Sequence, residues 1–380
     1  MPKMLWHSNS PMAGTGYGNQ TMIFTRLLHK AGWDVTVSSN YGISGASINY
    51  EGIRILPKGV EAWGNDILPT HYKLFEPDVV FSLMDSWIID PDALGELPLA
   101  AWTPIDHLTV PPKAAEVLHR IPFPIAMSKH GESAMRDIGL DPFYIPHGVV
   151  TDIFKPLENR AELREKFKFP EDAFIVTMVA ANKGFPSRKS FEAVLKAWKY
   201  FHKQHPEAIL YMHTLPLPVH NGLDFDKAMQ YYNINHGEVR FANMYDLLMG
   251  NYQWEYMVQL LNVSDFMLLP SKGEGFGIPV IEAHACGCPT IVSDFTAQAE
   301  LGSAYKIPID PIDDVIMTQQ WSEQANVPPS KILAALEWAY ANKDNEELRK
   351  AARQEAMRYD AGHVLMTHML PVFNTIMAMQ

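Results

Sequence analysis

The stretch from Lys272 to Asp294, KGEGFGIPVIEAHACGCPTIVSD, constrains the fold of this chain more than any other. An apolar run at residues 265–270 precedes it as a candidate buried strand, and three glycines then lead into a helix that we expect to end near Gly287. A second apolar strand follows at residues 290–292. This order is typical of a parallel α/β sheet, and the loop offers free amides and the positive end of a helix to an anion.

Two carboxylates flank this loop. Glu274 precedes the helix, and Glu282 lies about one turn inside it. Carboxylates are not expected beside an anion site unless they bind another group. A sugar diol is such a group, because it can donate two hydrogen bonds to one carboxylate. The alternative is an ordinary loop-to-helix turn of an α/β protein that binds nothing.

The run EGFGIPVIEAHACGCPTIVSD resembles the E-x7-E signature of retaining glycosyltransferases of the GT-B fold, family four (glycosyl transferases group 1). The resemblance implies an α/β fold of two Rossmann-like domains that face each other across a cleft, with a C-terminal helix that crosses back to the first domain. It further implies that Glu274 lies by the donor sugar as a catalytic residue and that Glu282 binds the nucleotide ribose. The amides of Gly275, Phe276 and Gly277 would hold the donor diphosphate.

The length of 380 residues suits two domains of ordinary size. The segment YIPHGVVTDIFKP resembles the connection between the two domains of that family, with His147 and Val150 in place of Asn and Asp. We therefore predict an N-terminal Rossmann-like acceptor domain over residues 1–150 and a C-terminal Rossmann-like donor domain over 151–360. Residues 361–380 would form the helix that packs back on the N-terminal domain.

The first glycine-rich loop, SNSPMAGTGYGNQ, follows a short strand candidate and leads into a helix. Its spacing is G-x-G-x-G rather than G-x-G-x-x-G, and no acid for a ribose follows the next strand at residues 34–37, so a nicotinamide-dependent dehydrogenase is disfavoured. The resemblance implies that this loop faces the cleft, which makes Gly16 and Gly18 candidates for binding donor phosphate. A tight turn without a ligand is the alternative.

Asp106 and His107 follow a predicted strand at residues 99–103. Open α/β sheets bind their ligands at the carboxyl ends of strands, so this pair is a candidate for a catalytic role near the donor sugar. A helix-capping Asp beside a surface His is the alternative.

Three cations, Lys183, Arg188 and Lys189, lie between a strand predicted at residues 173–179 and a helix that we expect to begin near Ser187. Arg and Lys make charge-assisted hydrogen bonds to phosphate, so we predict that all three bind the donor diphosphate. The resemblance implies that Lys183 and Lys189 occupy the places of a family Arg and Lys. A solvated run of charge at a helix start is the alternative.

The net charge of −12, from 43 acidic and 31 basic residues, argues against a broad nucleic-acid surface. Cys286 and Cys288 are the only cysteines, so neither a disulfide framework nor a zinc site is expected, and a reducing, cytoplasmic location is favoured. The N-terminal residues lack the pattern of a signal peptide, and no apolar run is long enough to span a membrane.

The resemblance implies an enzyme of class EC 2.4 that moves a hexose-type sugar from a UDP- or GDP-linked donor to a hydroxyl acceptor. It implies retention of configuration by same-face attack, with no cofactor and no metal. A nucleotide-sugar epimerase of the same fold and a non-catalytic nucleotide-sugar-binding relative remain alternatives. The acceptor stays open among a glycan, a lipid-linked sugar, a small molecule, a protein and a hydroxymethylated base of viral DNA, and so does the oligomeric state.

Overall fold

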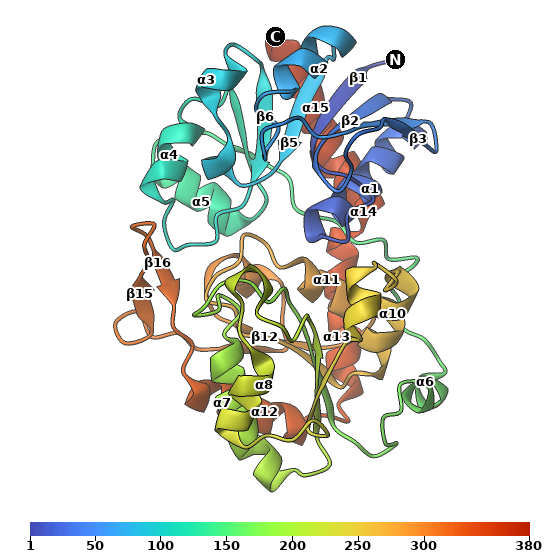
Figure 1. Cartoon of the computed structure of the whole chain (residues 1–380), viewed down its shortest axis with the longest axis vertical. Helices are drawn as coiled ribbons and strands as arrows, with labels where there is room; N and C mark the ends of the chain where they lie inside the picture. Colours follow the sequence, from blue (N-terminus) through green and yellow to red (C-terminus); the bar gives the residue numbers. More distant parts are fainter. The chain divides into compact units, whose positions relative to one another are not determined.

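The computed structural model describes all 380 residues, which form two compact units (Figure 1). Unit 1 comprises Met1–Val150, Thr318–Ser322 and Tyr359–Gln380, and unit 2 comprises Thr151–Met317 and Glu323–Arg358. The short segment 318–322 therefore groups with the N-terminal residues although unit 2 surrounds it in the sequence. No helix of the chain is both long and apolar enough to span a membrane.

Unit 1 is built on an eight-stranded sheet in the order β3-β4-β2-β1-β5-β6-β7-β8. All neighbouring strands are parallel except β3 and β4. The strands are β1 (Lys3–Asn9), β2 (Asp34–Tyr41), β3 (Ile48–Tyr50), β4 (Ile53–Leu56), β5 (Val79–Leu83), β6 (Leu99–Thr103), β7 (Phe123–Ala126) and β8 (Phe143–Tyr144). The second strand is longer than predicted, because Ser38, Ser39 and Asn40 are buried and β2 pairs with β1 along its whole length.

Helices pack against this sheet, and helices of the C-terminal segment are among them. The helices are α1 (Gly16–Lys30), α2 (Leu68–Phe75), α3 (Pro91–Leu94), α4 (Pro112–Leu118), α5 (Lys129–Asp137), α14 (Ala361–Val364) and α15 (Leu370–Met379). Phe373 of α15 packs against Phe81 of β5, with ring centroids 5.2 Å apart, and against Trp33 at 5.7 Å. The apolar, Met-rich C-terminal segment thus contributes to the core of unit 1.

Unit 2 is built on a six-stranded parallel sheet in the order β11-β10-β9-β12-β13-β14, and a two-stranded antiparallel hairpin, β15-β16, is attached to it. The strands are β9 (Ile175–Val179), β10 (Ile209–His213), β11 (Val239–Phe241), β12 (Phe266–Leu269), β13 (Thr290–Ser293), β14 (Tyr305–Ile307), β15 (Val315–Met317) and β16 (Glu323–Ala325). Strands buried on both faces read as continuous apolar runs, which is how β9 and β12 appear in the sequence.

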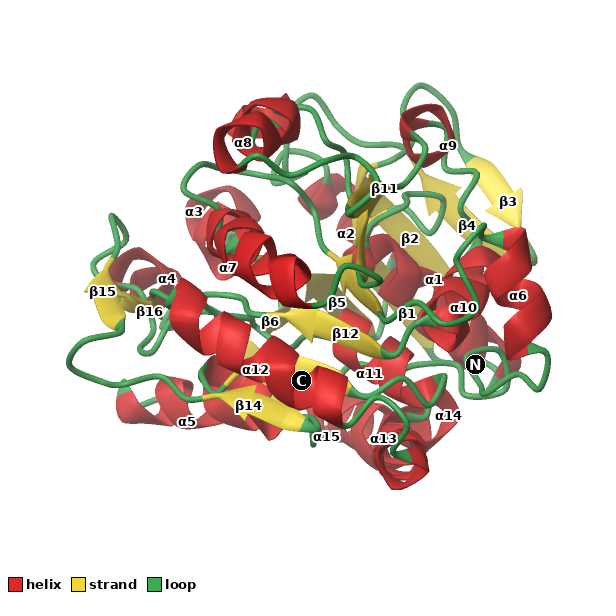
Figure 2. Cartoon of the chain, turned by 90° about the horizontal axis from the view of Figure 1, so that it is seen from below, coloured by secondary structure: helices red, strands yellow, loops and turns green.

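The helices of unit 2 are α6 (Arg160–Lys166), α7 (Phe191–Gln204), α8 (Phe225–Tyr232), α9 (Met244–Leu248), α10 (Trp254–Val263), α11 (Ile278–Ala285), α12 (Pro329–Ala341) and α13 (Glu346–Ala356). Helices α7 and α12 lie side by side against the sheet (Figure 2). Helix α7 buries an apolar face that includes Phe191, Leu195 and Trp198. The prediction that it begins near Ser187 was wrong, because the backbone turns through residues 185–189 and becomes helical only at Phe191.

Candidate functional site

The loop between β12 and α11 lies at the carboxyl edge of the unit 2 sheet. Gly277 precedes α11 with a φ of +111°, a left-handed backbone that favours glycine, and a Cβ there would lie 3.1 Å from Leu301. Pro279 lies in the first turn of the helix, where its missing N–H costs no hydrogen bond. Phe276 is buried and anchors the loop. The local sequence therefore specifies a sharp turn from strand into helix.

The amides of Gly275 and Gly277 are buried and make no hydrogen bond within the chain. Buried backbone amides without a partner are rare in native proteins, since each one costs the free energy of a lost hydrogen bond. Both amides lie at the amino end of α11, where the helix dipole also favours negative charge. The arrangement can bind an anion such as a phosphate group.

Glu274 is paired with two cations from the loop that follows β9. Lys189 Nζ donates to Glu274 Oε1, and Arg188 Nη1 donates to Glu274 Oε2 at 3.2 Å. Burial would raise the pKa of Glu274, but the charges of Lys189 and Arg188 outweigh that effect and hold the pKa at about 2. The carboxylate is therefore ionised at neutral pH, and its two cationic partners leave the cluster with a net charge of +1.

The pairing follows from the order of the strands. Because β9 and β12 are neighbours in a parallel sheet, the loops at their carboxyl ends meet. The backbone joins them further, since Lys272 N donates to Arg188 O at 2.8 Å. Arg188 Nη1 also donates to the carbonyl of Gly273. Arg188 is thus joined to the glycine loop by main-chain contacts as well as by charge.

Thr296 also belongs to this site, although no sequence motif points to it. Its hydroxyl accepts a hydrogen bond from Glu274 N at 2.9 Å. Its own φ is +51°, an uncommon backbone for a β-branched residue. A Thr just after a predicted strand carries no signal for such a contact. The short helix Thr296–Glu300 (η3) is needed to bring it to the glycine loop.

Glu282 lies in α11 and is half-buried, and its side chain makes no hydrogen bond or ion pair. Burial raises its pKa to about 8. A carboxylate in these surroundings is poorly solvated, so partners that donate hydrogen bonds to it would be stabilising. A pair of neighbouring hydroxyl groups can serve as such a partner.

Lys183 differs from the other two cations of its loop. Its side chain is exposed and makes no contact with an acid, whereas Arg188 and Lys189 both contact Glu274. The structure therefore brings together two of the three predicted phosphate-binding cations with Glu274 and leaves the ammonium group of Lys183 in solvent.

Asp106 and His107 lie in unit 1, on the loop that follows β6. His107 is buried, and its Nδ1 donates to Asp106 Oδ1 at 2.7 Å. His130 Nε2 donates to the carbonyl of His107 at 2.7 Å. The pair is therefore held in one orientation at the carboxyl edge of its sheet, as expected for a strand followed by polar side chains.

Gly16 and Gly18 have different surroundings at the start of α1. The Gly18 amide donates to the capping hydroxyl of Thr15 at 3.0 Å, and a Cβ on Gly18 would lie 2.2 Å from the carbonyl oxygen of Ala13. Close packing therefore explains glycine at this position. Gly16 is exposed, and its amide makes no hydrogen bond, so it is the more accessible of the two.

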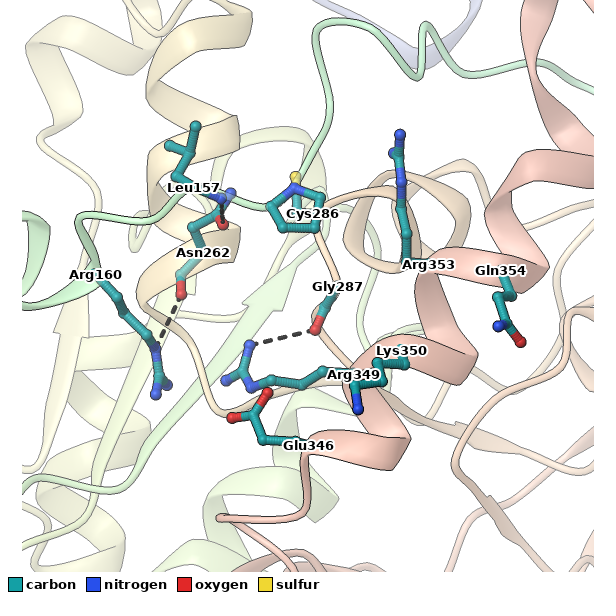
Figure 3. A pocket seen from close by; sticks show the side chains of 11 residues that line it. Leu157, Arg160, Asn262, Cys286, Gly287, Glu346, Arg349, Lys350, Arg353 and Gln354 are labelled. Carbon is teal, nitrogen blue, oxygen red and sulfur yellow. Dashed lines mark hydrogen bonds between the residues drawn. The ribbon is translucent and has the colours of Figure 1, made fainter.

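A cavity of about 520 Å³ lies at the other edge of the unit 2 sheet (Figure 3). Arginines from α6 and α13 line it, but backbone carbonyls already bind them. Arg160 donates to Asn262 O at 3.1 Å and Arg349 to Gly287 O at 3.2 Å. The free thiol of Cys286 also lines this cavity and is buried, as is that of Cys288. The arginines therefore hold chain segments together at this edge.

Comparison with known proteins assigns the chain to a family. The model of the glycosyl transferases group 1 family matches residues 159–355, which are more than half of the sequence. The chain belongs to this family. The match covers the whole glycine loop, both carboxylates and all three candidate cations of unit 2. The family named from the E-x7-E resemblance is thus confirmed at the level of glycosyl transferases group 1.

The matches to individual curated relatives are distant and partial. The serotype-specific mannosyltransferase WbdA of Escherichia coli is 27% identical over 146 residues, which are 38% of this chain and 16% of WbdA. The regions matched by this chain cover between 16% and 30% of the lengths of three curated relatives. These similarities therefore cover only part of each relative.

Solved structures resemble the chain over its full length. Sucrose-phosphate synthase from Thermosynechococcus elongatus has a TM-score of 0.76 at 16% identity, with 100% of both chains covered. Anabaena HepE, solved in complex with UDP-glucose, has a TM-score of 0.72 at 13% identity, with 98% of this chain and 99% of HepE covered. The predicted fold class is confirmed: this group 1 chain has the α/β architecture of GT-B glycosyltransferases.

Proposed function

We propose that this protein is a glycosyltransferase that moves a sugar from a nucleotide-diphosphate donor to a hydroxyl acceptor. The observation that carries the proposal is the pair of buried, unpaired amides at Gly275 and Gly277 beside Arg188 and Lys189. A diphosphate would satisfy these amides and compete with Glu274 for the two cations. Family membership supports the same interpretation, as does HepE, which was solved with UDP-glucose.

In this mechanism the loop stabilises the leaving diphosphate. Negative charge grows on the phosphate as the glycosidic bond opens, and preorganised amides and cations are most effective against charge that develops in the transition state. Lys183 would add a third cation once a phosphate is present. We propose that this stabilisation replaces a metal ion.

The two carboxylates would hold the donor. Phosphate binding to Lys189 and Arg188 frees Glu274 to accept hydrogen bonds from donor-sugar hydroxyls and to stabilise positive charge at the anomeric carbon. Glu282 would accept hydrogen bonds from the two ribose hydroxyls. We propose a UDP- or GDP-linked hexose as donor, retention by same-face attack, and a part for Asp106 and His107 in the transfer.

A thermal-shift titration tests the donor site. We expect UDP or GDP, with EDTA present, to raise the melting temperature more than ADP or CMP. The shift is measurable, because a ligand at 100 times its Kd contributes about 2.7 kcal/mol of stability. Incubation with UDP- or GDP-hexoses and a panel of acceptors, followed by NMR of the new anomeric proton, then tests transfer and retention. An epimerised donor formed without acceptor would favour an epimerase, and nucleotide binding without any turnover would favour a non-catalytic relative.

A further inference from the structure

Unit 1 contains a pocket of about 450 Å³ whose walls include two exposed indole rings, Trp87 and Trp321. Trp321 is 76% exposed and Trp87 is 44% exposed. Neither indole N–H makes a hydrogen bond within the chain. Trp63 adds a third exposed ring, edge-on to Trp87 with centroids 6.2 Å apart. Large apolar rings left in solvent around one hollow mark a binding surface.

Trp321 belongs to the turn between β15 and β16, the two strands of the hairpin. Its tip, residues 318–322, groups with unit 1. Ser322 Oγ lies 2.9 Å from Thr109 Oγ1 and donates to Thr109 O at 2.7 Å. Trp321 itself has a φ of +57°, an outlying backbone for a bulky residue. A strained residue held beside a fixed hydrogen-bond pair indicates that the position of this ring is specified by the fold.

Three polar side chains around the pocket have no hydrogen-bond partner within the chain. Glu116 of α4 and the neighbouring Gln319 and Gln320 of the hairpin tip are exposed, and none makes a side-chain hydrogen bond. Lys113 Nζ lies 5.9 Å from the centroid of the Trp87 ring. Amides and a carboxylate beside flat apolar rings suit a ligand with an apolar face and a rim of hydroxyl groups.

We propose that this pocket is a saccharide subsite that binds a sugar ring of the acceptor, which makes the acceptor a glycan. The C–H face of a pyranose ring would stack on Trp321 and Trp87, and its hydroxyls would reach Glu116, Gln319 and Gln320. The pocket also shares a loop with the candidate pair Asp106 and His107, because residues 104–111 run from β6 through that pair to the pocket wall. As an acceptor site it rests on the proposed transferase function.

A nucleobase could also stack on these rings, but charge argues against DNA as the occupant. The chain carries a net charge of −12, and the pocket pairs one lysine with one glutamate rather than presenting a basic stripe. A DNA acceptor would need phosphate contacts that this surface does not offer.

Saturation-transfer NMR on the full chain with maltotriose, cellotriose, mannotriose and chitotriose tests the subsite. We expect at least one trisaccharide to bind and the variants Trp321→Ala and Trp87→Ala to weaken it about 10-fold. Trp321→Phe, which keeps a ring, should retain most of the affinity. Tyr231→Ala is the matched control, since Tyr231 is 79% exposed but lies on α8 of unit 2.

The same samples are titrated with UDP and GDP so that the two proposals are judged separately. Nucleotide binding with no trisaccharide binding, or with binding that Trp321→Ala leaves unchanged, overturns the subsite and spares the donor site. Tryptophan-dependent trisaccharide binding without nucleotide binding supports the subsite and counts against the transferase. Tryptophan-dependent binding of an oligonucleotide carrying hydroxymethylcytosine, with no trisaccharide bound, would replace the glycan by DNA.

Discussion

The carboxylate of Glu274 forms an ion pair with the ammonium group of Lys189, and the guanidinium of Arg188 contacts its second oxygen at 3.2 Å. Without a ligand, Glu274 therefore compensates one of these two positive charges, and one remains. A dianionic diphosphate would change these contacts, because Lys189 and Arg188 would bind the phosphate groups. The carboxylate of Glu274 would then need hydroxyl groups as hydrogen-bond partners. Glu274 is thus the residue whose contacts we expect to change most when donor binds.

Glu274→Gln should reduce transfer by about 100- to 1000-fold, the range found when one group that stabilises developing charge is removed. The amide keeps the shape of the side chain but loses its charge, so the positive anomeric centre is no longer stabilised. Initial rates with the donor identified by titration provide the measurement. Glu158→Gln, an exposed glutamate of unit 2, is the control. Unchanged transfer in Glu274→Gln would remove this residue from the mechanism.

Glu282→Gln should stabilise the protein without ligand, and more strongly as pH rises. The pKa of Glu282 is raised to about 8, so above the ordinary pKa near 4.5 the folded state retains a proton that the unfolded chain releases. Stability is therefore lost as pH rises from 4.5 to 8, by about 1.4 kcal/mol for each pH unit. The glutamine side chain does not titrate, so the variant does not lose this stability.

Thermal melts from pH 5 to pH 8.5 measure the effect, with Glu165→Gln as an exposed control. The difference between Glu282→Gln and the wild type should widen up to about pH 8 and then level off. The same variant should bind UDP or GDP more weakly if the carboxylate accepts the ribose hydroxyls. A difference in melting temperature that is independent of pH would contradict the raised pKa.

Lys183→Ala should weaken nucleotide-diphosphate binding about 10-fold, which is typical of one lost charge-assisted contact, and leave the melting temperature without ligand unchanged. The reason is that Lys183 makes no contact with an acid in the free protein. Calorimetric titration with UDP and GDP measures the change. Lys196→Ala, an exposed lysine of α7, should bind as the wild type does. Equal affinities of both variants would exclude Lys183 from the donor site.

Gly18→Ala should destabilise unit 1 by about 1–3 kcal/mol, because its Cβ would lie 2.2 Å from the carbonyl oxygen of Ala13. Gly14→Ala in the same loop should have little effect, since nothing lies within 4 Å of a Cβ there. Urea denaturation of the two variants provides the comparison. Equal stability would show that the loop can relax around the added methyl group.

The sequence predicted the parallel sheets and the neighbourhood of the glycine loop because both rest on local patterns. The run 266–269 is apolar throughout, 290–293 is β-branched except for its last residue, and the glycines between the two runs leave little choice of backbone. Whether Lys183 or Lys189 would meet Glu274 could not be read from the sequence. That choice depends on the turn at residues 185–189, which delays α7 to Phe191 and directs Lys189 inward.

The hairpin could not be predicted for a different reason. Its strands, β15 and β16, are only three residues long, and their alternation is too short to distinguish from a loop. Its tip matters through contacts with Thr109, which is 213 residues away in the sequence. Thr296 was missed in the same way, since its role depends on tertiary position rather than on any motif.

The two cysteines have a practical consequence beyond the site. Cys286 ends α11 and Cys288 precedes β13, both are buried, and burial raises the pKa of Cys288 to about 12. A thiol reagent attacks the thiolate, so neither side chain will react until this helix and strand separate. Because the chain has no other cysteine, the rate of labelling under native conditions reports the local opening of the segment that joins α11 to β13. Donor bound at the amino end of α11 can then be detected as protection of its carboxyl end, with no label or tag engineered into the protein.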